Sequence, residues 1–533
     1  MTERAARGAR GALCLCVAGI VVSLGLRALY LRELDRIDLS EHPAFIAAEG
    51  VVGLMARHIL AGERPVFYYG QYYMGALEAY VAAGMFHVFG ASMAALRAVP
   101  MLFAIAWIPL AGALAGRLFG RRAGYLAAAL TALPSPFVFV WGFEARGGHA
   151  EHATLVLATL LVSVLLLERV SRARLAVLGF LTGVSLWVNQ LAVAYVPLYA
   201  WTVWPWLRTR RRELVLLLVI VLVGASPLVY GNLVEPLCTV RAVLAKVHAS
   251  YTFGARHTRA DEDDVSPSQE QFYRSLPLFE VLGAQPRRDG AWSVTGAFAA
   301  VGLLVAAIGS VWPWYRERPP AAINRGRWLL AGAVGMTILI GLGGFSGQPV
   351  GRYQLLLYPL LSVMAAGGFD RLMPRLAVPL VALIAFNQGV AIVQPPPPDE
   401  RTPTSAVIEA LRGQGLHYGY GADNMYDLVF ESSEEIVIEP LEWSRYGPYQ
   451  RALTAADRIF YLYRDDQETK VSYSVFREYL QRAGVQYRQL DVGRYHVLYD
   501  FVPRERLSDA TVQVLRDEIR TRKRQPRPPS SRR

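Results

Sequence analysis

Long apolar runs, separated by short clusters of arginine, are the main pattern along this chain of 533 residues. Several runs are roughly 20 residues long, enough to cross a bilayer core of about 30 Å as a helix that rises about 1.5 Å per residue. The pattern predicts eleven membrane spans. They cover residues 11–30, 96–116, 123–143, 150–167, 175–188, 191–207, 214–230, 292–312, 328–345, 354–369 and 377–393.

The arginine clusters predict the orientation of these spans, because short cytoplasmic loops carry an excess of Lys and Arg. Arginines precede the first span, so we expect a cytoplasmic N-terminus. Residues 74–90 are apolar but include Glu78 and His87. If this segment crossed the membrane, every later arginine cluster would lie outside the cell. If it instead lies along the outer surface as an amphipathic helix, all of those clusters are cytoplasmic and the C-terminus is outside. We expect this second placement, because it agrees with the excess of Lys and Arg in cytoplasmic loops.

The chain changes character after residue 394. Four consecutive prolines begin a stiff linker over residues 395–401. Residues 402–501 mix helical and strand-like patterns, which predicts a small extracytoplasmic α/β domain. Helices are expected at 406–413 and 475–483, and strands at 435–438, 459–463 and 495–499. The Arg- and Pro-rich residues 502–533 are typical of a disordered basic tail.

The predicted fold class is therefore mainly α: a polytopic transmembrane helical bundle over residues 1–394, followed by the small α/β domain. Two outer loops are long, residues 31–95 with juxtamembrane helices and residues 231–291. Composition agrees with this class, since 53% of residues are hydrophobic and 18% are charged, against about 25% charged in soluble domains. Cytoplasmic anchors account for the net charge of +12, so we expect the bilayer and not nucleic acid as the partner. The three cysteines have neither metal-site nor disulfide spacing.

The first outer loop concentrates titratable and aromatic residues beside the membrane, where such groups usually line a site or the interface. Glu49 precedes an apolar-periodic helix. A carboxylate beside an apolar surface can act as a general base, although a structural carboxylate at a helix start is the plainer alternative. The aromatic run that follows can stack on sugar rings or form an interfacial belt. Its candidate binding residues are Tyr68, Tyr69, Gln71, Tyr72 and Glu78.

Two more polar clusters are predicted on the same outer face. Residues 144–152 read EARGGHAEH, in which two glycines permit close approach of a ligand and the acids and histidines can carry protons or a weakly bound metal. Residues 347–353 contain Arg352, whose guanidinium can bind phosphate bidentately. A solvated helix cap and a snorkelling arginine are the plainer alternatives. The candidate binding residues are Glu144, Arg146, His149, Glu151, Arg352 and Tyr353.

Together these clusters predict a cavity in which a lipid-phosphate sugar binds. Arg352 would hold the phosphate leaving group and Glu49 would deprotonate the acceptor hydroxyl or amine. The sequence has no Walker A motif, no dinucleotide-binding motif and no acidic motif of nucleotide-sugar enzymes, which favours a lipid donor. No organic cofactor is implied, and the need for a divalent metal stays open.

Four segments carry a resemblance to membrane glycosyltransferases of the GT-C class, the class of the protein O-mannosyltransferases and the lipid A aminoarabinose transferase. They are AEGVVGLMARHILAGERPVFYYGQYYMG, FGASMAALRAVP, GRLFGRRAGYLAAALTALPSP and GRYQLLLYPLL. The resemblance implies inverting transfer from a polyprenyl-phosphate sugar to a glycan, lipid or protein acceptor. It also implies a multi-pass protein of the bacterial cytoplasmic (inner) membrane.

The resemblance implies that an acidic pair in the first outer loop supplies the base. The family usually has Asp-Glu where this chain has Ala48-Glu49. Glu49 must then act as the base in place of the missing aspartate, or a neighbour such as Glu41 or His42 must do so. Otherwise the protein is a non-catalytic binder of a lipid-linked sugar. A transporter or flippase is the other alternative, but the predicted spans are nearly free of charge and show no internal repeat.

Overall fold

The computed structural model describes residues 3–33, 44–245, 281–282, 294–311, 320–342, 351–393, 404–421, 425–441, 444–465, 467–503, 512–515 and 517–518. The chain forms two compact units, and each is described by itself. Unit 1 comprises Met1–Ile37, Gln71–Val81 and Ser92–Pro395. Unit 2 comprises Asp38–Gly70, Ala82–Ala91 and Pro396–Arg533. Much of the first outer loop therefore groups with the C-terminal residues.

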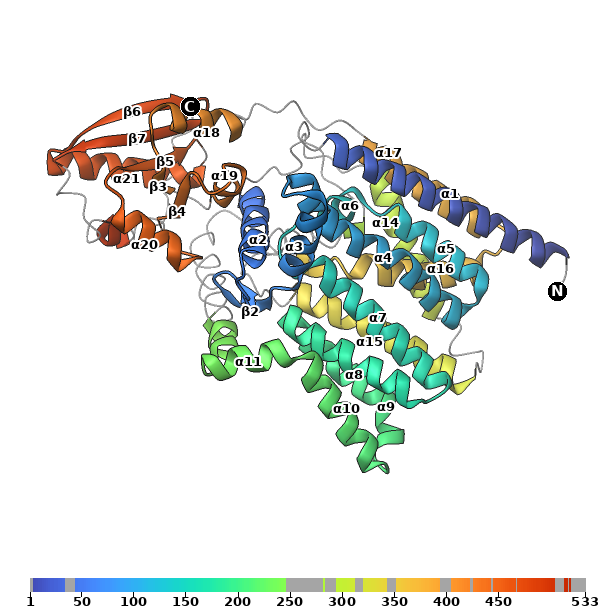
Figure 1. Cartoon of the computed structure of the whole chain (residues 1–533). Coiled ribbons are helices and arrows are strands. Elements are labelled where there is room, and N and C mark those ends of the chain that lie inside the picture. Colours follow the sequence, from blue (N-terminus) through green and yellow to red (C-terminus); the bar gives the residue numbers. More distant parts are fainter. Residues whose placement is uncertain are drawn as a thin grey trace, which may run out of the picture. The chain divides into compact units, whose positions relative to one another are not determined.

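Unit 1 is a bundle of apolar helices (Figure 1), and the mainly α fold is confirmed. Hydroxyl side chains begin some of these helices, as at α4, where Ser92 accepts from the N–H of Ala95. The described helical elements of the unit are α1 (Glu3–Glu33), α4 (Met93–Phe119), α5 (Arg121–Ala132), α6 (Pro136–Trp141), α7 (Ala150–Glu168), α8 (Arg172–Val188), η1 (Gln190–Tyr195), α9 (Val196–Leu207), α10 (Arg211–Gly224), α11 (Ser226–Val234), α14 (Val294–Val311), α15 (Ala321–Leu342), η3 (Gly351–Gln354), α16 (Leu357–Leu372) and α17 (Ala377–Val393). Strand β2 (Gln71–Gly75) also belongs to unit 1.

Helices able to cross a membrane are present, as an integral membrane protein requires. Among the described residues, Ala9–Leu31, Met93–Phe119 and Ala150–Glu168 are each long and apolar enough to do so. The pair α10 and α11 would be a fourth if counted as one bent span. The count of eleven spans stays a prediction.

Three of the expected continuous helices are interrupted. The segment 123–143 divides into α5 and α6, because Pro134 and Pro136 lack the N–H that a continuing helix needs. The segment 214–230 bends by 66° between α10 and α11, next to Pro227. The segment 191–207 begins as the 3₁₀ helix η1 before α9. Hydropathy alone did not reveal these breaks, since the flanking residues are apolar throughout.

The interior of unit 1 is filled by aromatic and aliphatic side chains from distant elements. Phe139, Phe143 and Ile392 form one buried cluster, against which Tyr30 packs. The Tyr30 ring lies 5.4 Å from both phenylalanine rings, centroid to centroid. The short helix α6 is thereby anchored to α1 and α17, and the polar turn that follows it is held on a rigid base.

Unit 2 contains helix α2 (Ala44–Leu60), strand β1 (Phe67–Tyr68) and the C-terminal α/β domain (Figure 1). Helix α3 (Leu77–Phe89) contributes residues to both units. The domain forms a mixed five-stranded sheet in the order β4-β3-β5-β7-β6, in which β3 runs parallel to β4 and β5 and the other pairs are antiparallel. Its elements are α18 (Thr404–Gly413), β3 (Tyr418–Gly421), α19 (Tyr426–Glu431), β4 (Val437–Pro440), α20 (Gly447–Ala455), β5 (Ile459–Arg464), α21 (Gln467–Ala483), β6 (Gln486–Val492) and β7 (Tyr495–Val502).

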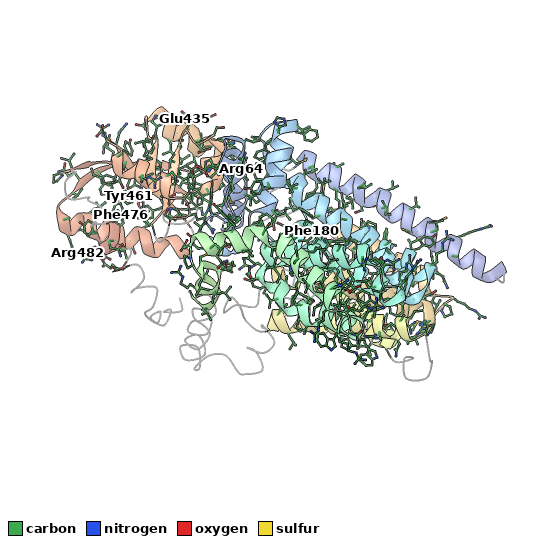
Figure 2. The ribbon with its side chains drawn as sticks, turned by 60° about the horizontal axis from the view of Figure 1, so that its bottom comes forward. Arg64, Phe180, Glu435, Tyr461, Phe476 and Arg482 are labelled. Carbon is green, nitrogen blue, oxygen red and sulfur yellow. The ribbon has the colours of Figure 1, made fainter. Side chains whose placement is uncertain are left out.

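The small α/β domain is confirmed, and each of its five predicted elements overlaps an observed one. The elements that sequence patterns missed are β3, β6, α19 and α20. Strand β3 is only four residues long and half glycine, and β6 is a largely exposed polar edge, so neither has an apolar pattern. The domain core packs α21 on β5, where the rings of Tyr461 and Phe476, labelled in Figure 2, lie 4.2 Å apart.

Some predicted features lie outside the described residues. They are Glu41 and His42, the acidic part of the second outer loop, residues 347–350, the proline-rich linker and most of the basic tail.

Candidate active site

A turn of two glycines is the centre of the polar cluster in unit 1. Gly147 and Gly148 both have left-handed φ angles, 74° and 75°, which glycine adopts without steric cost. The N–H of Gly147 donates to Glu78 at 2.5 Å and that of Gly148 donates to Glu151 at 2.8 Å. Glu78 is 2% exposed and Glu151 is fully buried. The sequence predicted that ligands approach this backbone, but the two N–H groups already bind carboxylates of the protein.

The same turn is held from a third side by Asn189, which the sequence reading did not identify. Its side-chain amide donates to the carbonyl of Gly148 at 3.1 Å, and its own carbonyl accepts from the N–H of Leu191 at 3.1 Å. Asn189 directly follows α8 and is buried. A polar residue between two apolar segments is the signal that could have marked it.

Glu144 and Arg146 form an ion pair immediately before the glycine turn, and both side chains are buried. The guanidinium of Arg146 also lies 3.9 Å from the ring centroid of Trp141, a cation–π contact with α6. Buried charges persist in proteins when they are paired in this way. The ion pair therefore places a fixed cation beside a fixed anion, next to the glycine turn.

His149 connects the glycine turn to the distant Arg352–Tyr353 segment. It is the N-cap residue of α7, and its ring lies 5.8 Å from Trp141 and 6.0 Å from Tyr353. The guanidinium of Arg352 lies 5.1 Å from the Tyr353 ring. Its buried Nε atom has no hydrogen-bond partner within the described part of the chain. Two clusters about 200 residues apart in sequence are therefore neighbours, as the sequence analysis expected.

Strand β2 presents two further candidates, Gln71 and Tyr72, and Tyr72 is 43% exposed. Burial, the negative charge of Glu235 and a hydrogen bond with Glu235 raise the pKa of the Tyr72 phenol. Glu235 in turn lies 3.5 Å from Arg241. Among the tyrosines proposed to bind the sugar, Tyr72 thus has an exposed side chain.

Glu49 belongs to unit 2. The sequence pattern suggested that Glu49 precedes the helix. Helix α2 instead starts at Ala44, so Glu49 lies in its second turn. Its side chain is 1% exposed. The hydroxyl of Tyr68 donates to the carbonyl of Ala48 at 2.9 Å and fixes the backbone next to Glu49.

Tyr68 and Tyr69 are largely occupied by contacts within unit 2. Tyr68 is buried beneath the guanidinium of Arg445, 5.5 Å from its ring. Tyr69 stacks on Tyr446 at 4.7 Å and donates to Glu63 at 2.6 Å. A role of these two rings as a sugar platform stays a prediction.

The structure thus brings seven candidates together in unit 1, while Glu49, Tyr68 and Tyr69 lie in unit 2. The seven are Glu78, Glu144, Arg146, His149, Glu151, Arg352 and Tyr353. Within the described ranges, no group of three or more His, Cys, Asp or Glu side chains is arranged to hold a metal ion.

The chain is similar to known proteins both in part of its sequence and in its fold. Residues 75–230 match the family model PMT_2, described as dolichyl-phosphate-mannose-protein mannosyltransferase. The fold is similar to that of ArnT from Cupriavidus metallidurans bound to undecaprenyl phosphate, with a TM-score of 0.58 at 14% identity over 91% of this chain and 97% of that one. No curated protein sequence matches the chain.

The oligosaccharyltransferase of Archaeoglobus fulgidus has a similar fold as well. Its complex with Zn and sulfate gives a TM-score of 0.53 at 14% identity, covering 86% of this chain and 69% of that one. Its form tethered to an acceptor peptide gives 0.51 at 12% identity, covering 92% and 74%. The chain therefore has the fold of the GT-C class. The family match is limited to residues 75–230, whereas the similarity of fold to ArnT extends over 91% of the chain.

Proposed function

We propose that this protein transfers a sugar from a polyprenyl-phosphate donor to an acceptor hydroxyl or amine, with inversion at the anomeric carbon. One observation carries the proposal. The stretch that matches the mannosyltransferase model, residues 75–230, contains the buried Glu78–Gly147 and Glu151–Gly148 hydrogen bonds and the Glu144–Arg146 ion pair. Burying three carboxylates and a guanidinium is costly for folding, which supports a functional reason for keeping them.

In the proposed reaction the acceptor atom attacks C1 of the sugar while the bond from C1 to the phosphate oxygen breaks. Polyprenyl phosphate leaves, and Glu49 takes the proton of the acceptor. Arg352 contributes by binding the phosphate as charge develops on the leaving oxygen, for which its planar guanidinium is suited. Tyr72 and Glu78 bind the sugar of the donor in this proposal.

The similar structures support the partners. The ArnT structure is a complex with undecaprenyl phosphate. An acceptor peptide is tethered in the similar oligosaccharyltransferase. For this chain we propose a polyprenyl-phosphate sugar as donor and a glycan, lipid or protein as acceptor. The proposed location is the bacterial cytoplasmic membrane, with the N-terminus cytoplasmic and the C-terminal domain outside.

The test is release of free polyprenyl phosphate from a labelled donor by the purified protein. Glu49→Gln removes the base and is expected to lower kcat about 100-fold or more. The control is Glu168→Gln, since Glu168 is partly exposed and pairs with Arg117. Turnover by Glu49→Gln at the wild-type rate would remove Glu49 from the mechanism.

Ala48 motivates a second candidate, a non-catalytic binder of a lipid-linked sugar. In that case the wild-type protein would bind the donor without releasing polyprenyl phosphate, and Ala48→Asp would create turnover. If Glu49 suffices as the base, Ala48→Asp changes the rate little. Movement of intact donor across proteoliposomes, with no release, would instead indicate a flippase.

The same assay decides the metal requirement. A complex with Zn is known for the similar oligosaccharyltransferase. Activity that is lost on adding EDTA and restored by Mg²⁺, Mn²⁺ or Zn²⁺ would assign a divalent metal to this protein. Activity unchanged by EDTA would assign the charge stabilisation to Arg352 and the other protein side chains.

A further inference from the structure

Helix α2, which carries Glu49, packs tightly on helix α19 of the C-terminal domain. Gly50 and Gly53, three residues apart, form the contact. A Cβ atom at Gly53 would lie 2.6 Å from the ring of Phe430, and one at Gly50 would overlap the carbonyl of Tyr426. Real Cβ atoms do not approach other atoms so closely, so the two helices can meet only where α2 has glycine.

Polar contacts continue this interface toward the end of α2. Arg57 donates to the carbonyl of Phe430 at 2.7 Å, and its guanidinium lies 4.2 Å from the Phe430 ring. The same carbonyl accepts from the backbone N–H of Ser433 at 3.0 Å, so Arg57 adds a second hydrogen bond to it. His58 Nε2 lies 3.0 Å from a carboxylate oxygen of Glu434, which also accepts from Tyr449 at 2.8 Å.

An aromatic stack holds the segment that follows α2. The Tyr446 ring stacks on both His58, 4.6 Å away, and Tyr69, 4.7 Å away, and the rings of His58 and Tyr69 lie 5.8 Å from each other. Arg445 donates to the carbonyl of Tyr69 at 3.2 Å. The hydroxyls of Tyr69 and Tyr446 both donate to Glu63. Residues 50–69 are thus held by residues 426–449 at successive points.

We propose that the C-terminal α/β domain is a positioning element for the catalytic base. It holds α2, and with it Glu49, in one orientation and keeps the carboxylate buried. The inference rests on the proposed function, in which Glu49 is the base. Displacing a reacting group by about 1 Å can lower a rate on the order of 100-fold, so loosening this interface should lower kcat more than substrate binding.

The first test compares two substitutions of helical glycines in the full-length protein. Gly53→Ala places a methyl group against Phe430, whereas Gly84→Ala on α3 adds one in open space. We expect Gly53→Ala to lower kcat about 10- to 100-fold, with little change in the KM for donor, and Gly84→Ala to leave both unchanged. Adding Phe430→Leu to Gly53→Ala makes room for the methyl group and should recover part of kcat.

The second test compares two neighbouring carboxylates. Glu434 contacts His58 of α2, while Glu435 pairs with Arg412 inside the domain. Glu434→Gln should lower kcat in the same direction as Gly53→Ala, and Glu435→Gln should not. Equal kcat values for the two variants would overturn the inference.

Hydrogen–deuterium exchange over residues 44–60 gives a readout that does not depend on activity. Exchange should rise in Gly53→Ala and Glu434→Gln and stay unchanged in the two control variants. If exchange rises but kcat does not fall, the domain does not position the base. If Glu49→Gln is itself fully active, the proposed function fails, whatever the exchange shows.

Discussion

The N–H of Gly148 donates a hydrogen bond to the carboxylate of Glu151 at 2.8 Å, so that an acid in the first turn of α7 closes back on the glycine before the helix. A carboxylate at a helix N-terminus is also stabilised by the helix dipole. With the matching bond from Gly147 to Glu78, two buried acids determine the shape of the turn that follows the Glu144–Arg146 pair.

Gly148→Ala should destabilise the protein and lower its activity. Alanine at a left-handed φ costs about 1–2 kcal/mol, and its Cβ would lie 3.1 Å from the carbonyl of Val188. The control is Gly90→Ala, which has a similar φ of 81° but nothing within 4 Å. Thermal unfolding in detergent should show the larger loss for Gly148→Ala. Equal losses would mean that crowding at Val188 is unimportant.

Glu78→Gln and Glu78→Ala separate the hydrogen bond of Glu78 from its charge. Glutamine can still accept from the N–H of Gly147, whereas alanine leaves that buried donor unpaired, at about 1–3 kcal/mol. We expect Glu78→Ala to lower the melting temperature and Glu78→Gln to preserve it. The rate of donor turnover by Glu78→Gln then reports the contribution of the negative charge alone. Turnover at the wild-type rate would make Glu78 a purely structural residue.

Arg352→Gln should raise the KM for the lipid-phosphate donor about 10- to 100-fold, the range expected for a hydrogen bond to a charged group. Arg352→Lys keeps the charge but loses bidentate geometry, so its KM should be intermediate. The matched control is Arg412→Gln, whose exposed arginine pairs with Glu435. A KM unchanged in Arg352→Gln would exclude this arginine from phosphate binding.

Asp427→Asn should remove a pH dependence from the stability of the C-terminal domain. Burial, helped by the charge of Glu431 and opposed by Arg464, raises the pKa of Asp427 to about 7. The unfolded chain releases this proton near pH 4. Between these values the folded state binds more protons, so stability falls as pH rises from about 4 to about 7.

The expected loss across that window is on the order of a few kcal/mol, since one pKa unit is worth about 1.4 kcal/mol. Asparagine cannot ionise, so the full-length variant should exchange amide protons over residues 425–431 at the same intrinsic-corrected rate at pH 5 and pH 8. Asp457→Asn, an exposed position, is the control. If Asp427→Asn retains the pH dependence of the wild type, another group is responsible for it.

The sequence predicted the mainly α class because apolar runs of bilayer length have few other structures open to them. It also predicted that the clusters at Glu144–Glu151 and Arg352–Tyr353 share one face, because consecutive spans return the chain to the same side. The ring contact between His149 and Tyr353 agrees with that expectation. The hydropathy pattern missed the helix breaks within 123–143 and 214–230, because the composition stays apolar there while proline interrupts the backbone hydrogen bonds.

By itself the sequence determined which segments are apolar and helical and that a small α/β domain follows them. Only the tertiary structure decided the partners of the polar residues: that Glu78 and Glu151 bind backbone N–H groups, and that α2 packs on α19 through Gly53 and Phe430. The physical reason is separation along the chain. Periodicity and motifs report neighbours within a few residues, whereas contacts between residues hundreds of positions apart depend on how complete helices and strands pack.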